Sequence, residues 1–312
     1  MPWRLETWSP EYVLPERVGE EEESRLEVKT GIEGAWEAQS PKLVSPEQWP
    51  KLYLVDGRQR IEAQLIDAEG RRAVLATVVA GAVLRDEGGI RPAGDPIKKH
   101  LLLHAGELQE SLPDGLRHYQ TYQVRRADPT SIRSSLTEAM RRLETELVNQ
   151  LEEGYVIVDG QLYPGGLTYR RPGRVLGYTK TQAATYLAPG ERGLLYRLEP
   201  YQRTPIFFLP GRGLGRAVDV YSWYLRLPLQ PSTPFHGASA LLRVESPTLE
   251  PAEAKELADL SVSLFCAMAS SPTKDPRAPQ NLVPVGGLEQ WLGQHMGSLE
   301  VVRRRIVEAL FA

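Results

Sequence analysis

Two carboxylates that each follow a short apolar segment are the residues of this sequence best suited to chemistry. Residues 52–55 read LYLV and precede Asp56 and Gly57, and residues 155–158 read YVIV and precede Asp159 and Gly160. An apolar, β-favouring run that ends at a turn signal predicts a buried strand of the parallel-sheet type. If the two strands lie parallel and side by side, Asp56 and Asp159 emerge at one edge of the sheet, within reach of one divalent cation.

The Asp-Gly pairs also have a simpler interpretation. Asp and Gly are residues that ordinary turns prefer, so either pair alone is explained by a turn. The repetition of the pattern, with a helical segment before the second copy, favours a shared architecture. Both interpretations stay open at the level of sequence.

The segment that follows Asp56 predicts an antiparallel meander. Residues 60–67 and 72–84 have strand patterns, and AEGR at 68–71 supplies a turn between them. Together with 52–56 they make three strands joined by short turns. Residues 86–128 look less regular.

Two histidines in that irregular segment, His100 and His104, are four residues apart, a spacing that places both on one face of a helix. A metalloprotease helix would carry Glu directly after the first histidine, and Leu101 stands there instead. We therefore expect side chains at the surface or facing nucleic acid, and no metal site.

A long helix is predicted to follow, over residues 128–151. It opens with a capping residue, Asp128, and a proline in the first turn. Its apolar stripe recurs at steps of four and three residues and consists of Leu136, Met140, Leu143, Leu147 and Leu151. At about 100° per residue, Glu144 and Glu146 lie at opposite borders of the stripe and Glu138 faces solvent. Only a carboxylate at a border of the stripe, Glu144 or Glu146, can point along the seam between helix and sheet.

The helix leads back into the strand that ends at Asp159, which completes a strand, helix, strand crossover. A meander, a crossover helix and a strand parallel to the first is the order of the ribonuclease H-like fold, whose carboxylates bind two divalent metals. Two cations about 4 Å apart activate a water and stabilise the leaving oxygen in phosphodiester cleavage. Hard oxygen ligands suit Mg²⁺ or Mn²⁺.

The rest of the chain predicts an α/β protein with additions at both ends. Residues 1–50 carry an acidic run and scattered tryptophans, and we expect an N-terminal arm that packs across a main domain at 51–312. Further strands are predicted at 174–180, 205–209, 221–227 and 240–245, and amphipathic helices at 251–269 and 288–311.

Composition excludes several classes of protein. The 312 residues are 41% hydrophobic and 25% charged, which is typical of a globular protein. The net charge of -3 argues neither for nor against a polyanionic partner, so a nucleic-acid surface would need locally clustered arginines. The single cysteine, Cys266, excludes an internal disulfide and a thiolate metal cluster. No signal peptide or membrane segment is predicted, so we expect a cytoplasmic protein.

The sequence resembles the NurA nuclease family, whose members work with the HerA hexameric ATPase. The resemblance rests on short motifs in a fixed order: VDG at 55–57, MRRLE at 140–144, VDGQL at 158–162, GYTK at 177–180 with YL at 186–187, SWYLRL at 222–227, RVE at 243–245, and PQNL at 279–282 with LE at 288–289. It covers residues 51–312.

The resemblance implies a ribonuclease H-like core and manganese-dependent cleavage of single- and double-stranded DNA, with 5′-to-3′ exonuclease and single-strand endonuclease activity. It further implies a homodimer docked on HerA, acting in DNA end resection and double-strand-break repair. Asp56 and Asp159 match the metal-binding aspartates and Glu144 matches the intervening glutamate. Lys180 matches the lysine after the fifth strand, suited to hold a non-bridging phosphate oxygen.

Some archaeal members carry an active-site histidine near the C-terminus. The matching stretch here, NLVP at 281–284, has none, and His295 is displaced from it. Either Asn281 substitutes or that contribution is absent.

Four arginines are candidates for DNA contacts: Arg170, Arg171, Arg212 and Arg226. Arg226 and Glu245 could instead form an ion pair that supports the metal cluster from outside, and a plain structural pair is an equally good interpretation. Trp223 and Tyr224 are expected in the core rather than stacked on bases.

Two other functions stay open. One is a non-catalytic subunit that docks DNA or a HerA-type ATPase, and the other is a ribonuclease H-like nuclease that acts on RNA or on branched junctions.

Overall fold

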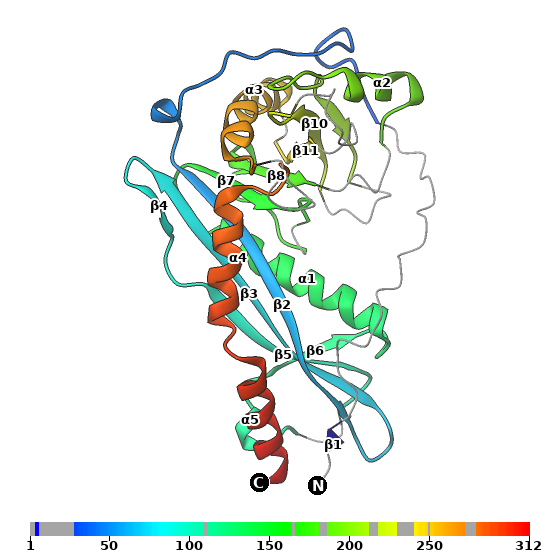
Figure 1. Cartoon of the computed structure of the whole chain (residues 1–312). Coiled ribbons are helices and arrows are strands. Elements are labelled where there is room, and N and C mark those ends of the chain that lie inside the picture. The colour runs from blue at the N-terminus through cyan, green and yellow to red at the C-terminus, as the bar shows by residue number, and fades with distance from the viewer. Residues whose placement is uncertain are drawn as a thin grey trace.

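One mixed sheet runs through the computed structural model, with helices on both faces (Figure 1). The structure describes residues 4–5, 28–108, 111–163, 166–180, 186–211, 218–229, 240–248, 250–271 and 279–312. Within them the sheet has 11 strands in the order β6-β5-β3-β2-β7-β8-β11-β10-β9, with β1 paired to β2 and β4 paired to β3. The strands are β1 Arg4–Leu5, β2 Leu52–Ile66, β3 Arg72–Asp86, β4 Gly89–Pro92, β5 Ile97–Ala105, β6 Gln120–Val124, β7 Tyr155–Asp159, β8 Val175–Thr179, β9 Phe207–Leu209, β10 Val220–Arg226 and β11 Leu241–Ser246. The helices are α1 Pro129–Val148, α2 Pro189–Arg197, α3 Pro251–Met268, α4 Val283–His295 and α5 Leu299–Phe311.

The meander differs from the prediction in how its strands are divided. The two strands expected at 52–56 and 60–67 are one continuous strand, β2, which ends at Ile66, so Asp56 lies inside a strand and not at its end. The polar stretch GRQR at 57–60 interrupts the apolar pattern, but its backbone stays paired to β3 from Gly57↔Ala80 to Arg60↔Thr77. The third meander strand is β5, which lies in the segment expected to be irregular.

The predicted crossover is present. The Asp128 side chain accepts a hydrogen bond from Ser131 N and caps α1. The buried face of α1 packs on β2 and β3, and its residues are Ile132, Leu136, Ala139, Leu143 and Leu147. The chain then returns as β7, parallel to β2. Meander, helix and parallel strand therefore follow one another in the expected order.

The two faces of the sheet are covered by different helices. On one face, Tyr53 and Val55 of β2 pack with Leu143 of α1. On the other, Leu52 and Leu54 share a core with α3 and α4. Successive strand residues point to opposite faces, so even-numbered residues of this part of β2 face α3 and α4, and odd-numbered residues face α1. Figure 1 shows α4 and α5 running along the long β2–β3 hairpin.

The C-terminal region forms two helices instead of the single one predicted at 288–311. The helices α4 and α5 are separated at Gly297, whose φ of 68° is a conformation that glycine adopts easily. The α2 helix was not predicted. No helix in the described parts of the chain is long and apolar enough to cross a membrane.

The described part of the N-terminal arm, residues 28–50, lies against β9 and its surroundings. Lys29 exchanges two backbone hydrogen bonds with Phe208. The Glu33 carboxylate binds the buried guanidinium of Arg203 at 2.8 Å.

The two histidines lie on a strand, β5, and not on a helix. Thr77 Oγ1 is 2.8 Å from His100 Nδ1. The side chain of His104 is buried, with Nδ1 3.0 Å from the Gly106 carbonyl oxygen, so the expectation of a surface position is wrong for His104.

Candidate functional site

Asp56 and Asp159 lie on adjacent parallel strands at corresponding positions. The β2–β7 register pairs Val55 with Val158, so the next residue on each strand is an aspartate. Every second residue of a strand points to the same face. Asp56 comes two residues after Leu54 and Asp159 two residues after Ile157, and both of these residues face α3 and α4. The two aspartates therefore point to that face. Because β7 stops at Asp159 while β2 continues, the pair lies where the short parallel strands end against the long hairpin.

Glu144 comes close to Asp56 from the α1 face, on the other side of the β2 backbone. Its side chain is only 5% exposed. A Cβ atom on Gly57 would lie 2.5 Å from Glu144 Oε1, so only the absence of a side chain at Gly57 lets this carboxylate lie against the β2 backbone beside Asp56. Of the two glutamates at the borders of the α1 stripe, the structure buries Glu144. Glu146 instead binds Lys99 at 2.6 Å, and Glu138 is exposed.

Lys180 supplies the positive charge of the group. It directly follows β8, and its Nζ is 2.7 Å from Asp159 Oδ2. The two side chains are 13% and 14% exposed. Lys180 is therefore part of the carboxylate group and not an ordinary surface lysine.

The negative charge of the group exceeds what Lys180 balances. Burial raises the pKa of Asp56 from 3.8 to about 7, and the charges of Asp159 and Glu289 add to the rise. The Gly57 N–H and Lys180 act against it. Burial and the charge of Asp56 also hold the pKa of Glu144 well above its ordinary value, although Arg141 opposes them. The group therefore favours protons or cations at neutral pH.

Two residues near the carboxylates had no predicted role. Glu289 lies on α4, exposed, and its charge acts on Asp56. The Arg58 Nη1 atom donates to the Glu289 carbonyl oxygen at 2.9 Å and ties this helix to β2. Tyr178, on β8, stands opposite Asp159 in the register. Both appear in the motifs of the family resemblance, but no local pattern shows that α4 lies over β2.

The donor set suits a hard cation. Asp56, Glu144 and Asp159 offer carboxylate oxygens, the ligands that Mg²⁺ and Mn²⁺ prefer. Among the described residues, no three His, Cys, Asp or Glu side chains form a group that could hold an ion as they stand. Mg²⁺ commonly uses one or two carboxylates and completes its coordination with water and substrate phosphate, a requirement that Asp56 and Asp159 meet.

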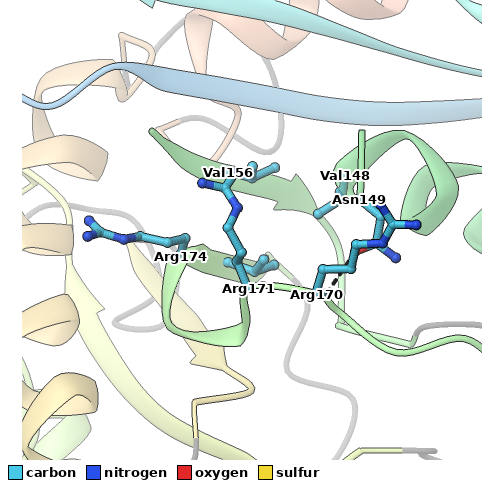
Figure 2. A pocket seen from close by; sticks show the side chains of 7 residues that line it. Val148, Asn149, Val156, Arg170, Arg171 and Arg174 are labelled. Carbon is cyan, nitrogen blue, oxygen red and sulfur yellow. Dashed lines mark hydrogen bonds between the residues drawn. The ribbon is translucent and has the colours of Figure 1, made fainter. Parts of the chain in front are cut away.

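Arg170 and Arg171, which were expected to contact DNA, lie away from this site. Arg170 and Arg171 lie with Arg174 around a small cavity that Val156 and Val175 also line (Figure 2). These valines are at the starts of β7 and β8, the opposite strand ends from Asp159. Figure 2 shows Arg170 and Arg174 extending to opposite sides of Arg171, which donates to the Leu151 carbonyl oxygen.

Two further arginine predictions have different outcomes. Arg212 lies outside the described residues. Arg226 is 1% exposed and donates to the Leu195 carbonyl oxygen at 3.0 Å, so its expected contact with DNA is wrong: a buried guanidinium cannot reach a phosphate. Glu245 binds Arg243 and accepts from Leu162 N at 2.6 Å.

The expected core aromatics are in the core. Trp223 is fully buried and donates from Nε1 to Ser261 Oγ at 2.9 Å, and Tyr224 is buried beside it on β10.

The model of one protein family, described as the NurA domain, matches residues 71–285. The chain belongs to the NurA family. The matched range includes Glu144, Asp159 and Lys180, while Asp56 and Glu289 lie outside it. No curated protein matches this NurA-family chain.

Several solved structures are similar to it. The crystal structure of the NurA nuclease from Sulfolobus solfataricus is 11% identical, with a TM-score of 0.44 over 86% of this chain and 89% of that chain. A structure of NurA bound to dAMP and manganese is 11% identical, with a TM-score of 0.29 over 79% of this chain and 85% of that chain. A structure of NurA with manganese is 17% identical, with a TM-score of 0.21 over 44% and 24% of the two chains.

Proposed function

We propose that this NurA-family protein is a metal-dependent DNA nuclease with its active site at Asp56, Glu144, Asp159 and Lys180. The observation that carries the proposal is the pair Asp56 and Asp159 at corresponding positions of the parallel strands β2 and β7, beside Lys180, with buried Glu144 close to Asp56 and raised pKa values for Asp56 and Glu144. Structural ion pairs normally lower carboxylate pKa values, so the unbalanced charge points to a cation-binding function. Family membership supports the reaction class.

Asp56 and Asp159 would hold the cation, with Glu144 as the third carboxylate. The two crystal structures that contain manganese support Mn²⁺, and Mg²⁺ has the same ligand preference. When bound, one or two such ions activate water and stabilise the leaving oxygen of the phosphodiester.

The chain's own residues contribute positioning and charge. Among the described residues, Lys180 is the only cationic side chain that pairs with Asp159. Its ammonium group is therefore suited to bind a non-bridging phosphate oxygen at this site. Asp56 and Glu144 are buried, so their carboxylates lie in a region of low dielectric. Electrostatic interactions with a cation are stronger there than in water. Arg170 and Arg171 would contact the DNA backbone away from the carboxylates.

Family membership supports a more specific proposal for the activity, the biological process and the partner. We propose 5′-to-3′ exonuclease and single-strand endonuclease activity in DNA end resection and double-strand-break repair, by a cytoplasmic homodimer that works with a HerA-type hexameric ATPase.

The test is degradation of linear DNA by the purified protein with Mn²⁺. Asp56→Ala and Asp159→Ala should each abolish cleavage, while the exposed Glu138→Ala serves as the matched control and should cleave like the wild type. Retained cleavage in either aspartate variant would contradict the site.

A non-catalytic docking subunit is the second candidate, because no three ligands in the described residues are ready to hold an ion. A wild-type protein that binds DNA but never cleaves it with Mn²⁺ or Mg²⁺ would favour that function. Parallel digestion of RNA, junction and linear DNA substrates separates the nuclease classes.

A further inference from the structure

Tyr178 is a fully buried tyrosine beside the carboxylates. On β8 it stands between Asp159 of β7 and Val244 of β11 in the sheet register. Its ring packs on Phe265 of α3, with 5.3 Å between ring centroids. Lys180 Nζ lies 5.5 Å from the centre of the same ring. These contacts determine where the phenol hydroxyl lies.

The hydroxyl of Tyr178 has no hydrogen-bond partner within the described part of the chain. Buried hydroxyls without partners are uncommon, because the lost hydration is not replaced. This one stands opposite Asp159 in the register of β7 and β8, and that carboxylate lies close enough to act on it. A phenol keeps its proton at neutral pH, so this hydroxyl is a hydrogen-bond donor beside an acceptor.

Lys180 already occupies Oδ2 of the nearest acceptor, Asp159. A cation bound to Asp159 would compete with the lysine for this carboxylate. A carboxylate that ligates a metal is usually oriented by a neighbouring donor.

We propose that Tyr178 is a positioning residue, whose hydroxyl donates to the Asp159 carboxylate and orients it when Asp159 binds a divalent cation. The inference rests on the proposed function and adds a residue to it. It predicts that the hydroxyl contributes to cation affinity and not to the stability of the fold.

The test is Tyr178→Phe, which keeps the ring on Phe265 and removes one oxygen. Its matched control is Tyr221→Phe on β10, a buried tyrosine of the same core whose ring contacts Phe208 at 5.5 Å. Isothermal titration calorimetry with MnCl₂ should show about 10- to 100-fold weaker binding for Tyr178→Phe. The control should match the wild type.

Two further measurements separate positioning from a structural role. The melting temperature of Tyr178→Phe should equal or exceed that of the wild type, since the variant buries one unpaired hydroxyl fewer. Its DNA cleavage should recover when Mn²⁺ is raised in proportion to the lost affinity. Unchanged Mn²⁺ affinity in a folded variant would overturn the inference.

The proposed function can fail separately. If Tyr178→Phe behaves as wild type while Asp56→Ala and Asp159→Ala are inactive, only the inference about Tyr178 is wrong. If the wild type neither binds Mn²⁺ nor cleaves DNA, both are wrong.

Should Tyr178→Phe not fold, NMR of protein labelled with ¹³Cζ-tyrosine tests the same hydrogen bond. A tyrosine signal should shift when Mg²⁺ is added to the wild type and stay unmoved in Asp159→Asn. If no tyrosine signal shifts in the wild type, the inference is overturned.

Discussion

Lys180 Nζ and Asp159 Oδ2 form an ion pair of 2.7 Å at the ends of two neighbouring parallel strands, with both side chains largely buried. Asp159 also raises the pKa of Asp56, and Lys180 lowers it. The lysine therefore acts on the charge of the whole carboxylate group.

Lys180→Met should reduce Mn²⁺-dependent DNA cleavage by about 10²- to 10³-fold, the usual loss when one preorganised donor to the reacting oxygen is removed. Binding of Mn²⁺ should persist, since no carboxylate is lost. Single-turnover cleavage together with calorimetry checks both. The control is Lys99→Met. Lys99 forms an ion pair with Glu146, which lies at the other border of the apolar stripe of α1. Loss of Mn²⁺ binding in Lys180→Met would mean that the lysine holds the carboxylates in place.

The raised pKa of Asp56 predicts how the free energy of unfolding depends on pH when no divalent cation is present. Its pKa of about 7 in the fold exceeds the ordinary 3.8, so between these values the native state holds a proton that the unfolded chain has lost. The free energy of unfolding should fall as pH rises from 4 to 7, by on the order of 4 kcal/mol from this group alone. Urea unfolding at pH 4 and pH 8 in EDTA measures the fall.

Asp56→Asn should remove most of that pH dependence and be more stable than the wild type at pH 8, while losing cleavage. Mn²⁺ binds the deprotonated carboxylate, so its stabilisation of the wild type should grow with pH. Equal pH dependence in the two proteins would show that Asp56 is ionised throughout the range.

Gly57→Ala should push Glu144 away from the site. The added Cβ would lie 2.5 Å from Glu144 Oε1 and 2.8 Å from Met140 Cγ. Overpacking of this kind typically costs about 1 to 3 kcal/mol, and cleavage should fall with the displaced carboxylate. Thermal melts and DNA digestion test the variant beside Gly190→Ala, where an added Cβ meets nothing within 4 Å. A fully active Gly57→Ala would remove Glu144 from the proposed site.

Glu144→Gln and Glu146→Gln form a matched pair on one helix. Glu144→Gln should abolish cleavage and raise stability at neutral pH, because burial of its charge is unfavourable in the fold. Glu146→Gln should cleave normally and lose less than about 1 kcal/mol of stability, the usual value of a partly exposed ion pair. The opposite pattern of cleavage would place the active carboxylate on the other border of α1.

Several parts of the fold were predictable from local pattern. The capping residue and the apolar stripe of α1 are visible in the sequence, and the helical period places Glu144 and Glu146 at opposite borders of that stripe. The structure buries Glu144 and pairs the partly exposed Glu146 with Lys99. The parallel return to β7 then brings Asp159 beside Asp56.

Other parts of the fold could not be predicted from local pattern, because they depend on pairing between segments that are distant in the sequence. The polar stretch at 57–60 ends the apolar pattern, but β3 supplies its hydrogen-bond partners and β2 continues to Ile66. The guanidinium of Arg226 is buried, although arginine is usually exposed.

Sequence alone determined that two aspartates follow similar apolar segments and that a helix with a glutamate at each border of its apolar stripe separates them, since periodicity and capping act over a few residues. Only the tertiary structure decided that Gly57 lets Glu144 approach, that Lys180 pairs with Asp159, and that Tyr178 and Glu289 lie beside them. These relations join strands and helices far apart in the chain, and the burial and charge that shift a pKa arise only when those elements pack together.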